Sequence, residues 1–150
     1  MWIELATEAS PAAQFAPPAD PAAIDRIERR LGRPVPADLR VLLLETDGIL
    51  GEFDEGIVWT AERIAADNAS FRADPSFARL YEPFDKLLFF GDNDGGDQFA
   101  VVPGEPGAGV LVWEHETDTR RRVADDLADY LRRILSTDGD EWYVEEDEDE

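Results

Sequence analysis

Three short apolar runs in the second half of the chain most constrain how it can fold. Residues 87–90, 99–102 and 110–113 are each of strand length and rich in aliphatic and aromatic side chains. Turn-forming stretches, residues 91–97 and 104–109, separate them. Because connections this short return the chain antiparallel, the pattern predicts a hairpin with a longer loop, followed by a third strand.

Apolar residues at helical spacing flank these strands on both sides. Ile24, Ile27 and Leu31 predict one helix. Asp20 is placed to cap its first turn, and Gly32 is placed to end it. Further helices are predicted over residues 2–8, 36–46, 60–71 and 123–134, and a short strand over residues 57–59. Helices, then antiparallel strands, then a closing helix predict an α+β domain.

The 150 residues have the length of one domain. We expect this domain to cover residues 1–136, with an N-terminal helix and a connector in residues 1–20. Residues 137–150 are expected to form an acidic, flexible tail, because runs of like charge are usually disordered. Two roles are open for Trp142 and Tyr143, namely docking on the domain or forming a short motif that binds a partner.

The formal net charge of -21 at pH 7 decides which partners suit the chain. Nucleic acids and anionic membranes are poor partners, because both need Lys and Arg to replace their counterions. A basic protein is a suitable partner, since a field of opposite sign accelerates its approach. The simpler interpretation is that the acidity only keeps the protein soluble.

Several compartments and site types are incompatible with the sequence. Cysteine is absent, so disulfides, Cys-based zinc sites and thiol nucleophiles are excluded. No apolar run approaches the roughly 20 residues that span a bilayer. Glu4 and Glu8 stand where a secretory signal carries basic residues. We therefore expect a cytoplasmic protein.

The loop over residues 92–97 has the composition of a calcium loop, but Pro103 stands where such a loop needs a bidentate Glu. Turn chemistry accounts for its residues without a cation. His115, the only histidine, is too little for a zinc site. With no nucleophile elbow, phosphate loop or dinucleotide fingerprint, we expect no catalytic residue, metal or cofactor. A metal-dependent hydrolase using Asp92 and Asp94 is the alternative enzyme hypothesis.

Five groups of residues follow one another in order along the chain. They are Ile24-x-x-Ile-Glu28-x-x-Leu31-Gly32, Val35-Pro36-x-Asp38-Leu39, Leu43-x-Glu45-Thr46-Asp47-Gly48, Leu87-Leu88-Phe89-Phe90-Gly91-Asp92 with Gly96-Asp97-x-Phe99, and Trp113-x-His115-Glu116-x-Asp118-x-Arg120. In this order they resemble the SUKH superfamily, which includes Smi/Knr-type cell-wall regulators and bacterial toxin-immunity proteins. The resemblance covers roughly residues 2–135. Val35 stands where the family usually has Leu, and the acidic tail is not a family feature.

The resemblance implies a single α+β domain with a mainly antiparallel sheet covered by helices. It also implies a non-enzymatic protein-binding module, acting as a bacterial immunity protein that binds and neutralises a cognate toxin, commonly a nuclease. A Smi/Knr-like regulatory scaffold that binds endogenous proteins is the alternative. In either case we expect a monomer or a weak dimer.

The candidate partner-binding residues lie mainly in two acidic loops. Acidic loops are more often merely solvated, but they are also the surfaces that meet a basic partner. The candidates are Glu52, Asp54, Glu55, Asp92, Asp94 and Asp97, followed by His115 and Asp118.

Overall fold

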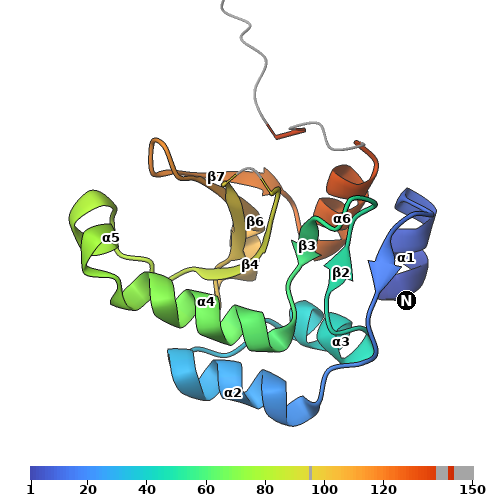
Figure 1. The fold of residues 1–150 in the computed structure, drawn as a ribbon, viewed down its shortest axis with the longest axis horizontal. Coiled ribbons are helices and arrows are strands. Elements are labelled where there is room, and N and C mark those ends of the chain that lie inside the picture. The colour runs from blue at the N-terminus through green and yellow to red at the C-terminus, as the bar shows by residue number, and fades with distance from the viewer. Residues whose placement is uncertain (95, 138–141, 144–150) are drawn as a thin grey trace, which may run out of the picture.

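A computed structural model describes residues 1–94, 96–137 and 142–143 (Figure 1). The described chain forms six α-helices and two antiparallel sheets, which confirms the predicted α+β fold. The helices are α1 (Trp2–Ala9), α2 (Pro21–Leu31), α3 (Ala37–Glu45), α4 (Ala61–Ala73), α5 (Pro75–Leu80) and α6 (Leu127–Leu135). None of these helices is both long and apolar enough to cross a membrane.

The larger sheet contains the three strands that the sequence predicts, plus one more. Its order is β4-β5-β6-β7, all antiparallel, and a short 3-10 helix, η1 (Pro106–Ala108), lies between β5 and β6. The strands are β4 (Leu88–Asp92), β5 (Gln98–Val101), β6 (Val110–Glu114) and β7 (Thr119–Ala124). The predicted helix start at residue 123 is therefore wrong, because Ala124 pairs with Val110 in the sheet. Helix α6 begins only after Asp126, whose carboxylate accepts the amide hydrogen of Asp129.

The smaller sheet consists of β1 (Gln14–Phe15), β2 (Ile49–Leu50) and β3 (Gly56–Val58), in that order. The predicted strand over residues 57–59 corresponds to β3. At the end of β3, the Trp59 amide donates to the Phe90 carbonyl of β4 at 2.7 Å, so the two sheets meet there. Gly91 makes this approach possible, because a β-carbon at that position would collide with the Ile57 carbonyl.

Local signals explain where α2 and α4 begin and end. The Asp20 carboxylate accepts the Ala22 amide hydrogen at 2.9 Å, and Gly32 ends α2 with φ 73°. The Thr60 side chain caps α4 in the same way. After α4, Asp74 and Pro75 interrupt the chain, and the Asp74 side chain caps the additional helix α5.

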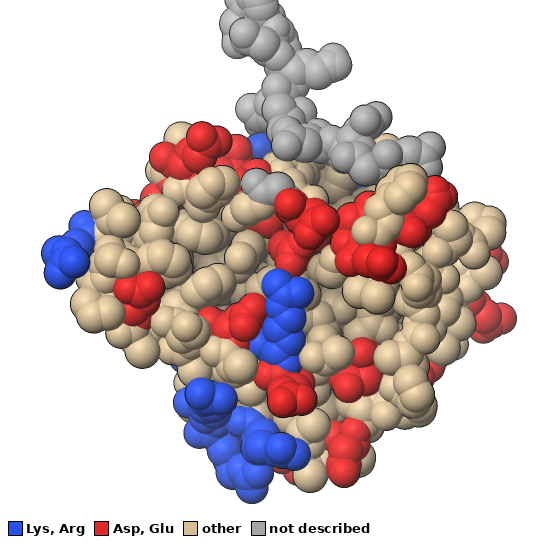
Figure 2. All heavy atoms as spheres, viewed as in Figure 1, with Lys and Arg blue, Asp and Glu red and all other residues tan. Residues whose placement is uncertain are grey.

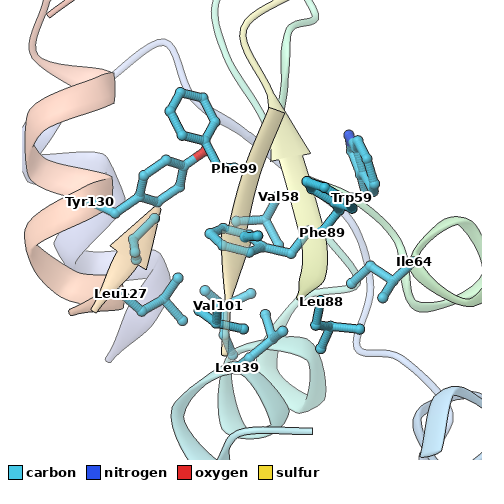
Figure 3. Packing of buried hydrophobic residues seen from close by; sticks show 14 of the residues in the cluster. Leu39, Val58, Trp59, Ile64, Leu88, Phe89, Phe99, Val101, Leu127 and Tyr130 are labelled. Carbon is cyan, nitrogen blue, oxygen red and sulfur yellow. The ribbon is translucent and has the colours of Figure 1, made fainter. Parts of the chain in front are cut away.

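One apolar core joins the helices to both sheets (Figure 3). Helix α4 packs on α2 and β4, while α6 packs on α1 and β7. Tyr130 of α6 faces Phe99 with ring centroids 5.0 Å apart, and its hydroxyl donates to the Ile57 carbonyl at 2.7 Å. Burial, with a smaller contribution from nearby Asp92, raises the pKa of Tyr130 well above its ordinary value. The contacts of Tyr130 with Ile57 and Phe99 hold α6 against β3 and β5.

The C-terminal region is described only in part. Of the predicted tail over residues 137–150, only Thr137, Trp142 and Tyr143 lie within the described residues. Trp142 stacks on Phe99 at 5.9 Å, and Tyr143 is buried. Docking on the domain is therefore the arrangement that the structure shows for this pair.

Candidate functional site

The connection between β2 and β3 presents an aromatic side chain between acidic ones. Glu52, Phe53 and Asp54 are exposed, with 71% of the Phe53 surface accessible. The Gly51 amide donates to the Glu55 carbonyl at 2.9 Å, which closes the turn. The Phe53 amide donates to the Glu55 carboxylate at 2.8 Å, so this carboxylate stabilises the turn from within. We call residues 52–55 the acidic loop.

Gln14 of β1 fixes the acidic loop to the small sheet. Its side-chain amide donates to the Gly51 carbonyl at 2.9 Å and to the Asp54 carboxylate at 2.8 Å. Asp54 adopts a left-handed backbone conformation with φ 65°, which Asp tolerates better than most residues. A loop held in this way loses less conformational entropy when its exposed side chains bind a partner.

An apolar groove of about 270 Å³ lies on the small sheet beside the acidic loop. All three strands contribute to its lining, together with the start of α4. Its lining residues are Gln14, Phe15, Ala16, Asp47, Gly48, Ile49, Leu50, Gly56, Val58, Trp59, Thr60 and Arg63. The groove therefore offers space for an apolar side chain next to an acidic surface.

Asp92 is held by two of the residues that line this groove. Its carboxylate accepts hydrogen bonds from the Trp59 indole at 2.8 Å and from the Arg63 guanidinium at 3.1 Å. That guanidinium also lies 4.2 Å from the centroid of the Trp59 ring. Only 8% of Asp92 is exposed, so its oxygens are engaged inside the protein.

The β4–β5 loop and the β6–β7 turn meet through Asp97 and His115. The Asp97 carboxylate lies 3.2 Å from His115 Nδ1 and accepts the Tyr143 hydroxyl hydrogen at 2.7 Å. Asn93 in turn donates to the same hydroxyl at 2.6 Å. Asp94 is the exposed acid of this loop, and its amide donates to Asp92 at 2.8 Å. The end of the described chain is thus anchored on the β4–β5 loop.

Asp118 sits at the other end of the β6–β7 turn and faces the segment after α5. Its carboxylate accepts hydrogen bonds from the Glu82 amide, the Trp113 indole and the Arg120 guanidinium. Burial alone would raise the pKa of Asp118, but these three interactions together outweigh it and hold the pKa below its ordinary value. The Asp118 carboxylate is therefore occupied by contacts within the domain.

The eight candidate residues fall into two groups. Glu52, Asp54 and Asp94 are exposed, whereas Glu55, Asp92, Asp97, His115 and Asp118 are buried or half-buried and have partners within the domain. Figure 2 shows acidic side chains over the β2–β3 and β4–β5 connections on one face, and basic side chains over α2. Within the described residues, no group of three or more His, Asp or Glu side chains is arranged to hold a metal ion.

Three residues of this region were missed by sequence reasoning. Phe53 lies between two of the predicted partner-binding acids, and a lone aromatic residue among acids is a usable signal. Gln14 lies in a stretch rich in Ala and Pro that shows no strand pattern, and Arg63 lies on a predicted helix with nothing to mark it. Their contacts to Asp54 and Asp92 depend on tertiary structure.

A family model described as the SMI1 / KNR4 family (SUKH-1) matches residues 18–133. The match covers well over half of the 150 residues, from the approach to α2 into α6. It includes the acidic loop, most of the groove and the β4–β5 loop. No curated protein matches the chain.

Proposed function

The chain belongs to the SMI1/KNR4 family (SUKH-1), and on that premise we propose that it is an immunity protein that neutralises a basic toxin domain. The family covers both cell-wall regulators and toxin-immunity proteins, and it is generally non-catalytic. A protein-binding role is common to the two groups. The choice between them depends on the surface that this chain offers.

The acidic loop is the observation that carries the proposal. Phe53 is the most exposed aromatic side chain in the described chain, and Glu52 and Asp54 are exposed on either side of it. Partner surfaces obtain most of their binding energy from a few buried aromatic anchors. Acidic neighbours fit the Lys and Arg side chains with which a nuclease binds phosphates. Occupying those side chains blocks access to the nucleic acid.

The groove supports a second contact next to the loop. Its volume of about 270 Å³ is below the range of about 300–1,000 Å³ that small-molecule sites occupy. It suits one or two apolar side chains of a partner better than a metabolite. Leu50, which lines the groove and is 40% exposed, connects it to the loop that follows β2.

A regulatory scaffold that binds endogenous proteins is the second candidate. The apolar lining of the groove favours it, because such a site does not need a basic partner. The two functions differ in how strongly binding depends on salt, since only contacts between charges are screened.

The experiment uses the full chain as bait in its source cell, with washes at low and then moderate salt. The immunity function predicts recovery of a basic protein whose binding weakens as salt rises. The purified partner is then assayed for nucleic-acid cleavage with and without this chain. Inhibition of cleavage supports the proposal. Recovery of endogenous proteins that survive the salt wash, with no cleavage to inhibit, indicates the scaffold instead.

Matched variants then test the surface. Phe53→Ala should weaken partner binding by about 30-fold, which corresponds to about 2 kcal/mol for a central anchor. Leu80→Ala is the control, because Leu80 is 69% exposed but lies on α5. Glu52→Gln combined with Asp54→Asn should mainly slow association and reduce its dependence on salt. Equal affinity of the Phe53 and Leu80 variants would remove the acidic loop from the interface.

A further inference from the structure

A second cavity, of about 480 Å³, lies where the start of α3, the β5–β6 connection and the start of α6 converge. We call it the α3–α6 cavity. Val101 and Leu127, which line it, are buried core residues and lie side by side (Figure 3). Its volume falls within the range of about 300–1,000 Å³ that small-molecule sites occupy. The apolar lining consists of Pro36, Ala37, Val101, Val102, Val110 and Leu127.

The β5–β6 connection, which forms one wall of this cavity, is held in place by its own backbone. The Glu105 amide donates to the Val102 carbonyl at 3.0 Å, and the Ala108 amide donates to the Glu105 carbonyl at 3.0 Å. Gly109 has φ 68°, and a β-carbon there would collide with the Ala124 carbonyl of β7. A wall fixed in this way loses little conformational entropy when a ligand binds.

Three carboxylates are the charged groups among the described lining residues, namely those of Asp38, Glu105 and Asp126. In the described part of the chain none of the three has an ion pair within 4.0 Å. Arg122 lies beside Gly109, but its guanidinium pairs with Asp125 at 3.0 Å. The negative charge around the cavity is therefore not neutralised by the domain itself.

Helix stability accounts for only part of this charge. Asp126 caps α6 with one carboxylate oxygen, and Asp38 lies in the first turn of α3, where the helix dipole favours an acid. Glu105 is exposed and lies between strands, so neither explanation applies to it. An anionic ligand would be repelled by all three carboxylates. A flat aromatic ligand would find no ring to stack on among the described lining residues.

We propose that the α3–α6 cavity binds a small aliphatic amine, with its hydrocarbon body against the valines and its ammonium group facing the carboxylates. The buried aliphatic floor accounts for the hydrocarbon body. The unneutralised acids and the net charge of -21 account for the cation. A free small molecule suits this volume better than it suits the smaller groove beside the acidic loop.

The site is independent of the toxin-binding function. The α3–α6 cavity shares no lining residue with the groove on the small sheet, and it contains no residue of the acidic loop. Either proposal can therefore fail without affecting the other.

The probes are octylammonium, octanol and octanoate, which share one hydrocarbon chain and differ in charge. Each is titrated to about 10 mM into the full chain labelled with ¹⁵N, and amide chemical shifts are followed. We expect octylammonium to produce saturable shifts concentrated in residues 37–38, 101–105 and 126–127. Octanol should bind about fivefold more weakly, and octanoate at least about tenfold more weakly.

A variant that fills the cavity tests its location. Ala37 is exposed and is the first residue of α3, so Ala37→Phe places a ring at the cavity without removing a core contact. The control is Ala22→Phe, an exposed alanine in the first turn of α2 that does not line the cavity. We expect about tenfold weaker binding of octylammonium in Ala37→Phe and at most about a twofold change in the control.

A second variant tests the charge. It combines Asp38→Asn, Glu105→Gln and Asp126→Asn, and Asn at position 126 can still cap α6. The control removes three exposed carboxylates outside the cavity, through Glu8→Gln, Glu62→Gln and Glu116→Gln. The cavity variant should bind octylammonium about fivefold more weakly and octanol within about twofold of the unaltered chain. The control should change neither affinity by more than about twofold.

Three results would overturn the proposal. The first is no saturable shift with octylammonium. The second is binding of octanoate as tight as that of octylammonium, and the third is equal weakening in the charge variant and its control. If Ala37→Phe does not fold, the position of the shifts in the unaltered chain decides the location. Shifts confined to the lining residues support the α3–α6 cavity, and shifts spread over the acidic surface contradict it.

Discussion

The indole N–H of Trp59 donates a 2.8 Å hydrogen bond to the carboxylate of Asp92, 33 residues later in the chain. Arg63 reaches the same oxygen and covers the indole ring. These three side chains connect the end of β3, the start of α4 and the end of β4. Asp92, which the sequence predicts to bind a partner, therefore holds two of the side chains that line the groove.

Removing this carboxylate should cost stability. Asp92→Ala leaves the Trp59 indole hydrogen buried without an acceptor and Arg63 without one of its two carboxylates. We expect a loss of about 2–3 kcal/mol in the free energy of unfolding, mostly from the buried hydrogen bond, because Arg63 is half exposed and its charge is screened. Urea unfolding measures this loss. Asp94→Asn, at an exposed position two residues away whose φ of 68° Asn also tolerates, should change it by no more than about 0.5 kcal/mol.

Asp118 should make part of the stability dependent on pH. Its pKa in the folded protein lies below the ordinary value of 3.8, so the unfolded chain takes up a proton first as the pH falls. The stabilisation is complete above that value and is lost as the pH falls through the folded pKa. Asp118→Asn should therefore be less stable than the unaltered protein near about pH 6, and the difference should shrink as the pH falls below the ordinary value of 3.8.

Urea unfolding across this pH range tests the difference. Glu116→Gln, an exposed position in the same turn, controls for the loss of one negative charge from a strongly acidic protein. The contrary result is that the free energies of unfolding of Asp118→Asn and of the unaltered protein differ by the same amount at every pH. That result would show that the carboxylate contributes through its shape and not through its charge.

Sequence reasoning identified the elements that carry a strong local pattern. The three apolar runs became β4, β5 and β6, and Asp20 and Gly32 delimit α2 as predicted. Strand β7 was missed because its sequence, Thr-Arg-Arg-Arg-Val-Ala, has no buried alternation and owes its conformation to pairing with β6. Strand β1 was missed for the same reason, since pairing with β2 is what orders two residues in a connector.

The candidate site was harder to predict than the fold. The sequence predicts which loops are acidic, but it does not predict which of their carboxylates face solvent. Asp92 and Asp54 lie in similar acidic, turn-forming segments, yet one is buried under an indole and the other is exposed. That difference is decided by Trp59 and by Gln14, which are distant in sequence from the acids that they hold.

Asn68 should be among the most sensitive polar positions of the core. It is 1% exposed, accepts the Phe89 amide hydrogen at 2.8 Å and donates to the Phe89 carbonyl at 2.8 Å. A side chain on helix α4 thereby pairs with both the backbone N–H and the backbone carbonyl of Phe89 in β4. Asn68→Ala leaves these groups buried and unpaired, and we expect a loss of about 2–4 kcal/mol. Thermal or urea unfolding measures it, with the exposed Ser70→Ala on the same helix as the control. A loss comparable to that of the control would mean that water replaces the amide.

Tyr143 should attach the end of the described chain to the β4–β5 loop mainly through its hydroxyl group. This group donates to Asp97 at 2.7 Å and accepts from Asn93 at 2.6 Å, while the ring packs edge-on against Phe99. Tyr143→Phe keeps the ring but removes both hydrogen bonds, and we expect a loss of about 1–2 kcal/mol, because Asp97 is only partly exposed and loses a donor. Tyr143→Ala should cost more, since it also removes buried aromatic surface.

Hydrogen exchange distinguishes a local effect of Tyr143→Phe from a global one. If Tyr143 stabilises only this junction, amides of β5 and the β4–β5 loop should exchange faster, while those of α2 and α3 should keep their protection. Asn93→Ala should produce the same local pattern, because it removes the donor to the same hydroxyl group. Unchanged exchange at the loop in both variants would show that ring packing against Phe99, and not the hydroxyl contacts, holds the junction together.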